Sequence, residues 1–198
     1  MTQGPLIILS GPSGGGKSTV IRRLLAEPGL PLRLAVSATT RPPRPGEKEG
    51  VDYYFWTRER FERQREAGAF LESAEYAGNL YGTLKSEVDG YRARGVGVLL
   101  DIDVQGAEQV RRKCPENVSI FLCAPSWEVY EQRLRRRHTE SEESIARRLA
   151  TARAELGRKG EYNHVVVNDE LGAAVAGVRR LIAPFFSLPE GGPTCSTS

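Results

Sequence analysis

A glycine-rich segment near the N-terminus has the spacing of a phosphate-binding loop. GPSGGGKST, residues 11–19, satisfies the pattern G-x-x-x-x-G-K-[ST] at Gly11, Gly16, Lys17 and Ser18. Glycines let consecutive backbone N–H groups approach phosphate oxygens, the lysine reaches the outer phosphates, and the hydroxyl binds Mg²⁺. The apolar run LIILS precedes the motif and the amphipathic run KSTVIRRLLA follows it, as the motif requires. The segment therefore predicts a binding site for a nucleoside triphosphate.

Two aspartates end an apolar run in the middle of the chain. Asp101 and Asp103 close VGVLLDID, and the carboxyl end of a parallel strand would bring them beside the phosphate loop and its metal ion. An alternative for Asp103 is capping of the helix predicted for VQGAEQV, because Asp is favoured at that position. A phosphate loop alone does not separate a GTPase, an ATPase motor and a small-molecule kinase.

A stiff basic loop is the second candidate for chemistry. TTRPPRPGEKEGVDYYF, residues 39–55, sets Arg41 and Arg44 among three prolines and follows them with Tyr53 and Tyr54. The prolines fix φ and push the residues before them out of the α region, so the loop is extended and lies on the surface. Such a loop can aim guanidinium groups at an anion. The alternative is a solvated basic loop, which is what most charge runs are.

The composition favours one domain without a large charged surface. The chain has 198 residues, which suits a single domain with a substantial core. Its 28 Lys and Arg stand against 25 Asp and Glu, for a net charge of +3. This excess is too small to favour wholesale binding to nucleic acid or to a membrane, so we expect neither partner.

The cysteines and the N-terminal residues favour a cytoplasmic location. Cys114, Cys123 and Cys195 are odd in number and share no metal-ligand spacing, which favours reduced thiols over disulfides or zinc. The N-terminus lacks the basic start and apolar stretch of a signal peptide, and no apolar run approaches the ~20 residues that span a bilayer.

Short apolar runs alternate with longer amphipathic ones along the chain. The apolar runs are LIILS, LRLAV, VGVLLDID, VSIFLC and HVVV, and the amphipathic runs include KSTVIRRLLA, VQGAEQVRRK and LGAAVAGVRRLI. Because the apolar runs are continuous rather than alternating in polarity, both faces of their sheet should be covered. We therefore predict an α/β fold with a five-stranded parallel sheet and helices on each side.

Two segments interrupt this alternation. Between residues 37 and 94 the apolar runs shorten and aromatic residues cluster, which predicts a small mixed subdomain inserted into the sheet order. Residues 133–158 are crowded with charge and predict an exposed helical excursion, and the polar residues 187–198 predict a disordered tail. The expected organisation is a single domain over residues 1–186, with its core in 4–36, 95–132 and 159–186.

Taken together, the motifs resemble those of guanylate kinases over residues 4–186. The resemblance is carried by GPSGGGKST, VSATTRPPRPGEKEGVDYYF, FLESAEYAGNLYGT, LDIDVQGAEQV, RRRHTESEESIARRL and VVVND, in this order. It implies a P-loop NTPase core with an inserted mixed α+β subdomain that binds GMP, residues 37–94, and a helical lid, residues 133–158. The implied reaction converts ATP and GMP, with dGMP as a further acceptor, into ADP and the nucleoside diphosphate with Mg²⁺, in purine nucleotide metabolism.

The resemblance assigns the acceptor site residue by residue. It implies that the GMP phosphate is bound by Arg41, Arg44, Tyr53 and Tyr81, and the base by Glu72 with Ser37, Thr83 and Asp101. Guanidinium forks offer rigid paired donors to phosphate. The carboxylate of Glu72 would accept from guanine N1–H and the 2-amino group, a donor pair that adenine lacks. The alternative for Glu72 is a plain surface carboxylate on a strand.

The resemblance also assigns the donor site and the lid. It implies ATP contacts from Gly11, Pro12, Ser13, Gly14, Gly15, Gly16, Lys17, Ser18, Thr19 and Asn168, and a catalytic set of Lys17, Arg41, Asp101, Arg137 and Arg148. Mg²⁺ would be held through Ser18, with Asp101 or Asp103 nearby. The neighbouring Arg133, Arg135, Arg136 and Arg147 are predicted to be solvated. Thr83 stands where serine is common in the family, and His138 stands where glycine is expected.

The implied mechanism needs no dedicated base, because a phosphate oxygen of GMP is already a nucleophile. Lys17, Mg²⁺ and the arginines would neutralise developing charge, and a mobile lid would exclude water. A rival hypothesis is a non-catalytic guanylate-kinase-like interaction domain, but Lys17, Ser18 and both lid arginines are present. A second rival is a related P-loop kinase for a sugar phosphate, which would have no use for Glu72. We expect a monomer or a homodimer.

Overall fold

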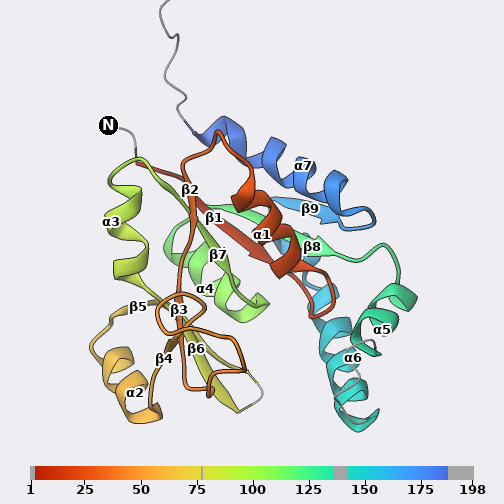
Figure 1. Cartoon of the computed structure of the whole chain (residues 1–198), viewed down its shortest axis with the longest axis horizontal. Helices are drawn as coiled ribbons and strands as arrows, with labels where there is room; N and C mark the ends of the chain where they lie inside the picture. Colours follow the sequence, from red (N-terminus) through yellow and green to blue (C-terminus); the bar gives the residue numbers. More distant parts are fainter. Residues whose placement is uncertain (1–2, 77, 136–141, 187–198) are drawn as a thin grey trace, which may run out of the picture.

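The computed structural model describes residues 3–76, 78–135 and 142–186, and these form a larger and a smaller β-sheet (Figure 1). In spatial order the strands of the larger sheet are β2 (Leu32–Leu34), β7 (Gly97–Asp101), β1 (Leu6–Ser10), β8 (Val118–Cys123) and β9 (His164–Val167). All neighbouring strands of this sheet are parallel. The prediction of a five-stranded parallel sheet in an α/β fold is confirmed.

Helices cover both faces of the larger sheet. α1 (Lys17–Ala26) and α7 (Leu171–Ile182) pack on the face to which Ile7 points, whereas α4 (Val104–Lys113) packs on the opposite face with Ile8. Successive side chains of a strand point to opposite faces. An unbroken apolar strand such as β1 is therefore what a sheet covered on both sides requires.

The smaller sheet lies below the larger one in Figure 1 and is built from the segment predicted to be an insertion. Its strands, in spatial order, are β4 (Tyr54–Phe55), β3 (Ser37–Thr39), β6 (Asn79–Leu84) and β5 (Phe70–Tyr76). The β3–β4 pair is parallel and the other two pairs are antiparallel. With α2 (Arg58–Glu66) against it, this unit has the mixed character expected from the sequence.

An aromatic cluster forms the core of the smaller unit. Phe61 of α2 stacks on Phe70 of β5 with ring centroids 4.4 Å apart, and Trp56 contacts both rings. The Arg60 guanidinium lies 4.3 Å from the centroid of the Trp56 ring. This small sheet thus has a hydrophobic core of its own, apart from the two clusters of the larger sheet.

A carboxylate joins the two sheets where the chain returns to the core. Glu87 lies in the 3₁₀ helix η1 (Lys85–Glu87), which is followed by α3 (Asp89–Arg92). Arg33 of β2 donates to Glu87 at 2.7 Å, and the Tyr54 hydroxyl of β4 donates to its other oxygen at 2.8 Å. One side chain therefore holds an edge strand of each sheet.

Two helices project from the right of the molecule in Figure 1. They are α5 (Trp127–Arg135) and α6 (Glu142–Leu156), and the Arg153 guanidinium of α6 lies 4.5 Å from the centroid of the Trp127 ring. The remaining 3₁₀ helices are η2 (Lys159–Glu161) and η3 (Ala183–Phe185). The predicted tail, 187–198, lies outside the described residues.

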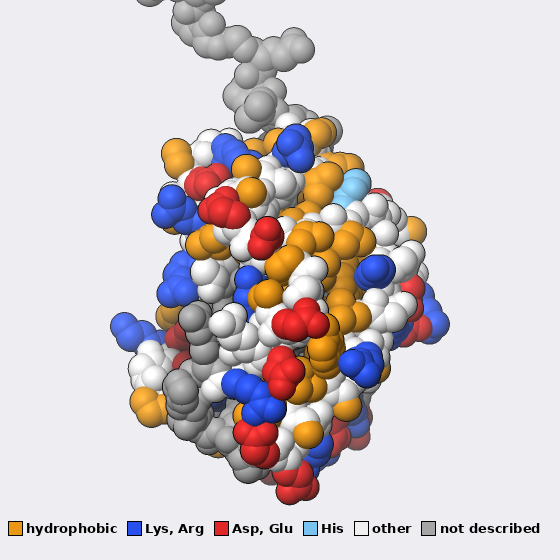
Figure 2. Space-filling view, turned by 90° about the vertical axis from the view of Figure 1, so that its right-hand side faces the viewer, with side chains coloured by type: hydrophobic (Ala, Val, Ile, Leu, Met, Phe, Trp, Pro, Cys, Tyr) orange, Lys and Arg blue, Asp and Glu red, His pale blue; other side chains and the backbone are white. Residues whose placement is uncertain are grey.

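The edge strand β9 carries apolar side chains that are open to solvent. Val165 and Val167 are 46% and 51% exposed. Figure 2 shows this side of the molecule, where apolar side chains form a band bordered by charged ones. Over the part of the chain that the structure describes, no helix is both long and apolar enough to cross a membrane.

Candidate active site

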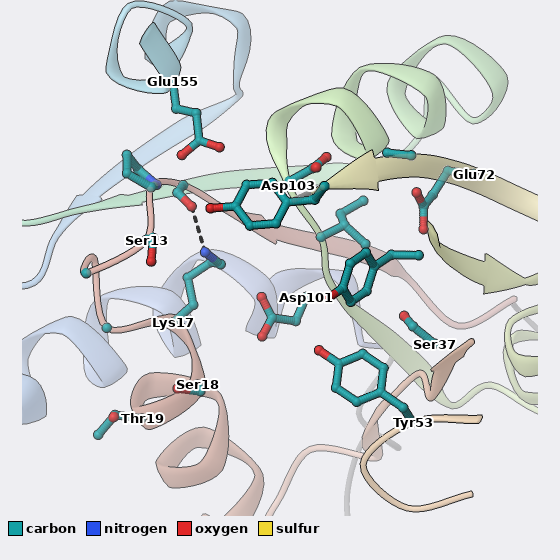
Figure 3. Close-up of a pocket in the computed structure, with 18 of the residues that line it drawn as sticks. Ser13, Lys17, Ser18, Thr19, Ser37, Tyr53, Glu72, Asp101, Asp103 and Glu155 are labelled. Carbon is teal, nitrogen blue, oxygen red and sulfur yellow. Dashed lines mark hydrogen bonds between the residues drawn. The ribbon is translucent and has the colours of Figure 1, made fainter. Parts of the chain in front are cut away.

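A cavity of about 410 Å³ lies between the phosphate loop, the smaller sheet and α6 (Figure 3). Its walls come from segments far apart in the sequence. The lining includes residues of the phosphate loop, Ser37, Tyr53, Glu72, Tyr76, Tyr81, Asp101, Asp103, Arg133 and Glu155. Most of the polar residues predicted for the two nucleotide sites therefore face one cavity.

The phosphate loop has the backbone that its glycines permit. Gly11 and Gly16 have φ values of 136° and 92°, which L side chains rarely adopt, and a Cβ on Gly11 would lie 2.1 Å from the Leu122 carbonyl oxygen. Lys17 donates to the Gly11 carbonyl at 2.6 Å and so spans the loop (Figure 3). The loop leads directly into α1, whose N-terminus favours a bound anion.

Asn168 and Arg133 support the phosphate loop from outside. The Asn168 amide donates to the Gly15 carbonyl at 2.9 Å, and Arg133 of α5 donates to the Asn168 carbonyl at 3.0 Å and to the Gly14 carbonyl at 3.4 Å. The prediction that Arg133 is solvated is wrong, because α5 places its guanidinium against the backbone carbonyls of Gly14 and Asn168. A second cavity, of about 260 Å³, is lined by Gly16, Thr19, Arg133, Asn168, Asp169 and Leu171.

The two aspartates differ in their surroundings. Asp101, at the end of β7, is exposed to solvent in the cavity. The surrounding protein reduces the hydration of its carboxyl group and so raises its pKa, and the nearby positive charge of Lys17 opposes this. Asp103 accepts from the backbone N–H groups of Gln105 and Gly106 at 2.9 and 2.8 Å. The helix-capping alternative for Asp103 is therefore correct, although the residue also lines the cavity.

The oxygen donors at this edge suit Mg²⁺ delivered with a nucleotide. Ser18 lies in the first turn of α1 and Asp101 borders the same cavity, so a hydroxyl and a carboxylate are available. Within the described residues, no group of three or more His, Cys, Asp or Glu side chains could enclose a metal ion. Mg²⁺ commonly takes one or two protein oxygens and completes its shell with phosphate and water. The residues present fit that kind of site.

Glu72, Thr83 and Ser37 form one row across three strands. In the register, Ser37 of β3 is opposite Thr83 of β6, which is opposite Glu72 of β5. Glu72 is only 4% exposed and accepts from the Thr83 N–H at 2.8 Å and from the Thr83 hydroxyl at 2.7 Å. Burial raises the pKa of the Glu72 carboxyl to about 7. The surface-carboxylate alternative for Glu72 is excluded.

The basic loop folds around a carboxylate of its own. Arg41 donates to Glu47 at 2.8 Å, and the Arg44 N–H donates to the other oxygen of Glu47 at 2.7 Å. The Arg41 guanidinium lies 5.4 Å from the centroid of the Tyr53 ring, which meets the Tyr81 ring edge-on at 6.1 Å. Arg41, Tyr53 and Tyr81 are thus brought together, whereas the Arg44 side chain is exposed.

The helix α6 closes the cavity from the side of the predicted lid. Arg148 donates to the Ser13 hydroxyl at 2.5 Å, so this arginine reaches the phosphate loop. Glu155, two turns further on, is buried, and burial raises its pKa to about 7 against the effect of Lys17. Arg137, Arg136 and His138 lie outside the described residues.

Comparison with known proteins agrees with this geometry. The sequence model described as guanylate kinase matches residues 3–184. The chain belongs to the guanylate kinase family. A guanylate kinase of Rubrobacter xylanophilus is 51% identical over 188 residues, which cover 92% of this chain and 97% of the relative. A guanylate kinase of Synechococcus sp. (strain JA-3-3Ab) is 49% identical over 183 residues, which cover 92% of this chain and 84% of the relative.

A solved structure supports the same conclusion. The crystal structure of guanylate kinase from Anaplasma phagocytophilum matches this fold with a TM-score of 0.77 at 34% identity, covering 96% of this chain and 89% of that chain. The predictions of a P-loop NTPase fold, of the guanylate kinase family and of an ATP-dependent kinase acting on GMP are confirmed.

Two residues of this guanylate kinase site were missed in the sequence. Glu47 follows Arg44 by three residues, and the Glu47 N–H donates to the Arg44 carbonyl at 3.0 Å, so a turn returns its carboxylate to both arginines. The available signal was the presence of acidic residues, Glu47 among them, between the glycines of the basic loop. Glu155 follows Arg148 by seven residues, which places the two on one face of α6. That spacing was visible, but the burial of a charged helix face was not.

Proposed function

We propose that this chain transfers the γ-phosphoryl group of ATP to the phosphate of GMP, or of dGMP, with ATP bound on the phosphate loop and the acceptor against the smaller sheet. One observation carries this arrangement: Ser37 and Glu72, which belong to one row with Thr83, line the same cavity as Lys17. A base held at that row has its phosphate directed toward Arg41 and Tyr53. The two nucleotides would then meet with their phosphates between the sheets.

The donor end is built for a triphosphate. Backbone N–H groups of the glycine-rich loop and the N-terminus of α1 bind the phosphates, and Lys17 exchanges its bond to the Gly11 carbonyl for a phosphate oxygen. Ser18, with Asp101 nearby, would hold Mg²⁺, which supplies positive charge between the outer phosphates. The second cavity, beside Asn168, suits the adenosine of ATP.

The acceptor end distinguishes guanine by its donors. Glu72 uses one oxygen for Thr83, and its ionised carboxylate keeps acceptor capacity for guanine N1–H and the 2-amino group. Adenine has an acceptor at N1, so its N1 lone pair would face the buried Glu72 carboxylate without a hydrogen bond between them. Burial raises the pKa of the Tyr53 hydroxyl to about 12, so this group stays a neutral donor to the acceptor phosphate.

The catalytic role of the protein is positioning and charge neutralisation. A GMP phosphate oxygen attacks the γ-phosphorus directly, so no side chain needs to remove a proton. Lys17 and Arg148 both bond to the phosphate loop. Arg41, now paired with Glu47, would turn to the acceptor phosphate, with Arg137 as a further lid contact, and together these groups would stabilise negative charge as it redistributes. Closure of α6 and the smaller sheet would exclude water and so prevent hydrolysis of ATP.

The cellular setting belongs to the same proposal. We place the reaction in the cytoplasm and in purine nucleotide metabolism, with ATP and GMP or dGMP as small-molecule substrates. We expect the protein to be a monomer or a homodimer.

A coupled assay across acceptors tests the proposal. Turnover with ATP should be efficient for GMP and dGMP and at least about a hundredfold weaker in kcat/KM for AMP and UMP, because these lack the guanine donor pair. Lys17→Ala should abolish turnover while its circular dichroism stays that of the wild type. Preference for a sugar phosphate would point to a different P-loop kinase. Binding of GMP without turnover would favour an interaction domain.

A further inference from the structure

The core helix α4 is attached to β5, the strand that carries Glu72. Gln109 of α4 accepts from the Ser73 N–H at 3.2 Å and donates to the Ser73 carbonyl at 2.8 Å, so its amide pairs with the strand as another backbone would. One helical turn further on, Lys113 donates to the Leu71 carbonyl at 2.6 Å. Both neighbours of Glu72 are therefore held by the core rather than by the smaller unit alone.

Gly106 completes the same face of α4. Residues 106, 109 and 113 are separated by three and four positions, the spacing that aligns side chains along one side of a helix. A Cβ on Gly106 would lie 2.5 Å from Oε2 of Glu72 and 3.1 Å from its Cδ. The carboxylate thus occupies the space that any side chain at position 106 would need.

Glu72 has little freedom to move aside. Its Oε1 accepts two hydrogen bonds from Thr83, and the side chain is almost completely buried. The first turn of α4 lies against the other oxygen, where the positive end of the helix dipole favours an anion. A methyl group at position 106 must therefore displace Oε2 toward the cavity or break the bonds to Thr83.

The helix itself would accept alanine. The φ of Gly106 lies outside the left-handed range, and the other near neighbour of the added Cβ is the Ile102 Cβ at 3.5 Å, an ordinary contact. Alanine also has a higher helix propensity than glycine. Gly106→Ala should therefore disturb the position of the Glu72 carboxylate without disturbing the formation of α4.

We propose that Gly106 is a specificity-determining residue, because its missing side chain lets α4 seat the Glu72 carboxylate where guanine is read. The inference rests on the proposed role of Glu72. Gln109 and Lys113 fix the strand, and Gly106 fixes the position of the carboxylate within it. Discrimination between guanine and adenine is in this way set partly by a helix that contributes no residue to the lining of the larger cavity.

The test compares Gly106→Ala with Gly177→Ala. Gly177 lies in α7, where an added Cβ would have Val166 Cγ1 as its nearest neighbour at 3.8 Å, so it is a matched glycine-to-alanine change in a helix. For Gly106→Ala, kcat/KM for GMP should fall about tenfold or more relative to that for AMP, as expected for a misplaced hydrogen-bonding group, while the KM for ATP stays within about twofold. Gly177→Ala should leave all three values unchanged.

The ratio of the two acceptors is measured in one preparation, so it does not depend on the fraction of active protein. An unchanged GMP-to-AMP ratio in Gly106→Ala would overturn the proposal. So would failure of this variant to fold, because the argument requires α4 to tolerate alanine.

A double-mutant cycle separates this inference from the proposed function. The change in melting temperature caused by Gly106→Ala should be more favourable in a Glu72→Ala background, where the conflicting carboxylate is gone. Additive changes would overturn the role of Gly106 and leave the role of Glu72 intact. Coupled stability with an unchanged GMP-to-AMP ratio in Glu72→Gln would overturn the reading of guanine by Glu72, and the specificity argument with it.

Discussion

A buried carboxylate is kept at the acceptor end of the cavity despite its cost. Glu72 loses water on nearly all sides, which raises its pKa to about 7, and its compensation consists of two hydrogen bonds from Thr83 and the adjacent N-terminus of α4. A core position of this kind is filled more cheaply by an apolar residue. The carboxylate is understandable if a ligand with two donors completes its hydrogen bonds.

Replacing this carboxylate by its amide should weaken the preference for guanine. Glu72→Gln retains the shape but offers one acceptor oxygen and directs an N–H₂ group at a guanine donor. A donor left unpaired in a closed site costs roughly 1–3 kcal/mol, so kcat/KM for GMP should fall about ten- to hundredfold. AMP should gain relative to GMP, because the amide can pair with adenine N1 and N6. Steady-state kinetics with both acceptors decide this, with the KM for ATP as control; an unaltered ratio would mean that guanine is read elsewhere.

The same carboxylate makes stability depend on pH. The pKa of Glu72 is raised from 4.5 to about 7 by folding, so its contribution is fully present below about pH 4.5 and is lost as pH rises through about 7. Between about pH 5 and about pH 8, the free energy of unfolding of Glu72→Gln should therefore rise relative to wild type by about 1–3 kcal/mol. Urea unfolding at the two pH values measures this.

Two controls accompany the pH experiment. Glu155→Gln should show the same trend, because burial raises the pKa of Glu155 to about 7 as well. Glu66→Gln removes an exposed carboxylate of α2 and should show no such trend. A parallel pH response of Glu72→Gln and Glu66→Gln would contradict the burial argument.

At the scale of elements, the sequence predicted those features that are determined by residues close together in the chain. The phosphate loop, the five apolar strands and the helices between them follow from local spacing, and the structure has them where they were predicted. The row of Ser37, Thr83 and Glu72 depends instead on the register of three strands, with an irregularity between Phe70 and Glu72. No spacing in the chain reveals that register. The resemblance pointed to these residues, and the strand register explains why they lie side by side.

The same limit explains the error about Arg133. Arg133 sits in a run of charge that looks solvated, yet the docking of α5 turns it onto the carbonyls of the phosphate loop. Arg135, in the same run, is exposed and pairs with Glu131 and Glu142 as expected for a surface side chain. Helical periodicity shows which residues share one face of α5, but only the packing of α5 in the fold shows which face contacts the phosphate loop.

The basic loop should serve the acceptor and not the donor. Arg41→Ala should weaken GMP binding by roughly 1.5–3 kcal/mol, the worth of a charge-assisted hydrogen bond, and leave ATP unaffected. Arg44→Ala should cost less, because its side chain is exposed and solvent screens it. Isothermal titration with each nucleotide, with Arg58→Ala as an exposed control, measures both losses. Equal weakening of ATP would show that the loop supports general stability.

At the scale of the whole molecule, the cavity lies where three structural units meet. The larger sheet supplies the phosphate loop, the smaller sheet supplies Ser37, Glu72 and Tyr81, and α6 supplies Arg148 and Glu155. The two sheets are joined by the Glu87 carboxylate, which binds Arg33 and Tyr54, and by the hydrogen bonds from Gln109 and Lys113 of α4 to β5. The smaller unit has an aromatic cluster of its own, whereas Leu71 of β5 and Tyr130 of α5 pack in a cluster of the larger sheet.

The placement of the two tryptophans has a spectroscopic consequence. Trp56 lies in the aromatic core of the smaller unit and Trp127 pairs with Arg153 between α5 and α6, so the smaller unit and the α5–α6 pair each carry one tryptophan. Trp127→Phe should leave an emission that responds to GMP, and Trp56→Phe an emission that responds to ATP. Titrations of each single-tryptophan protein would resolve the order in which the two sides close. Identical responses of both emissions to either nucleotide alone would instead show that the two sides move as one body.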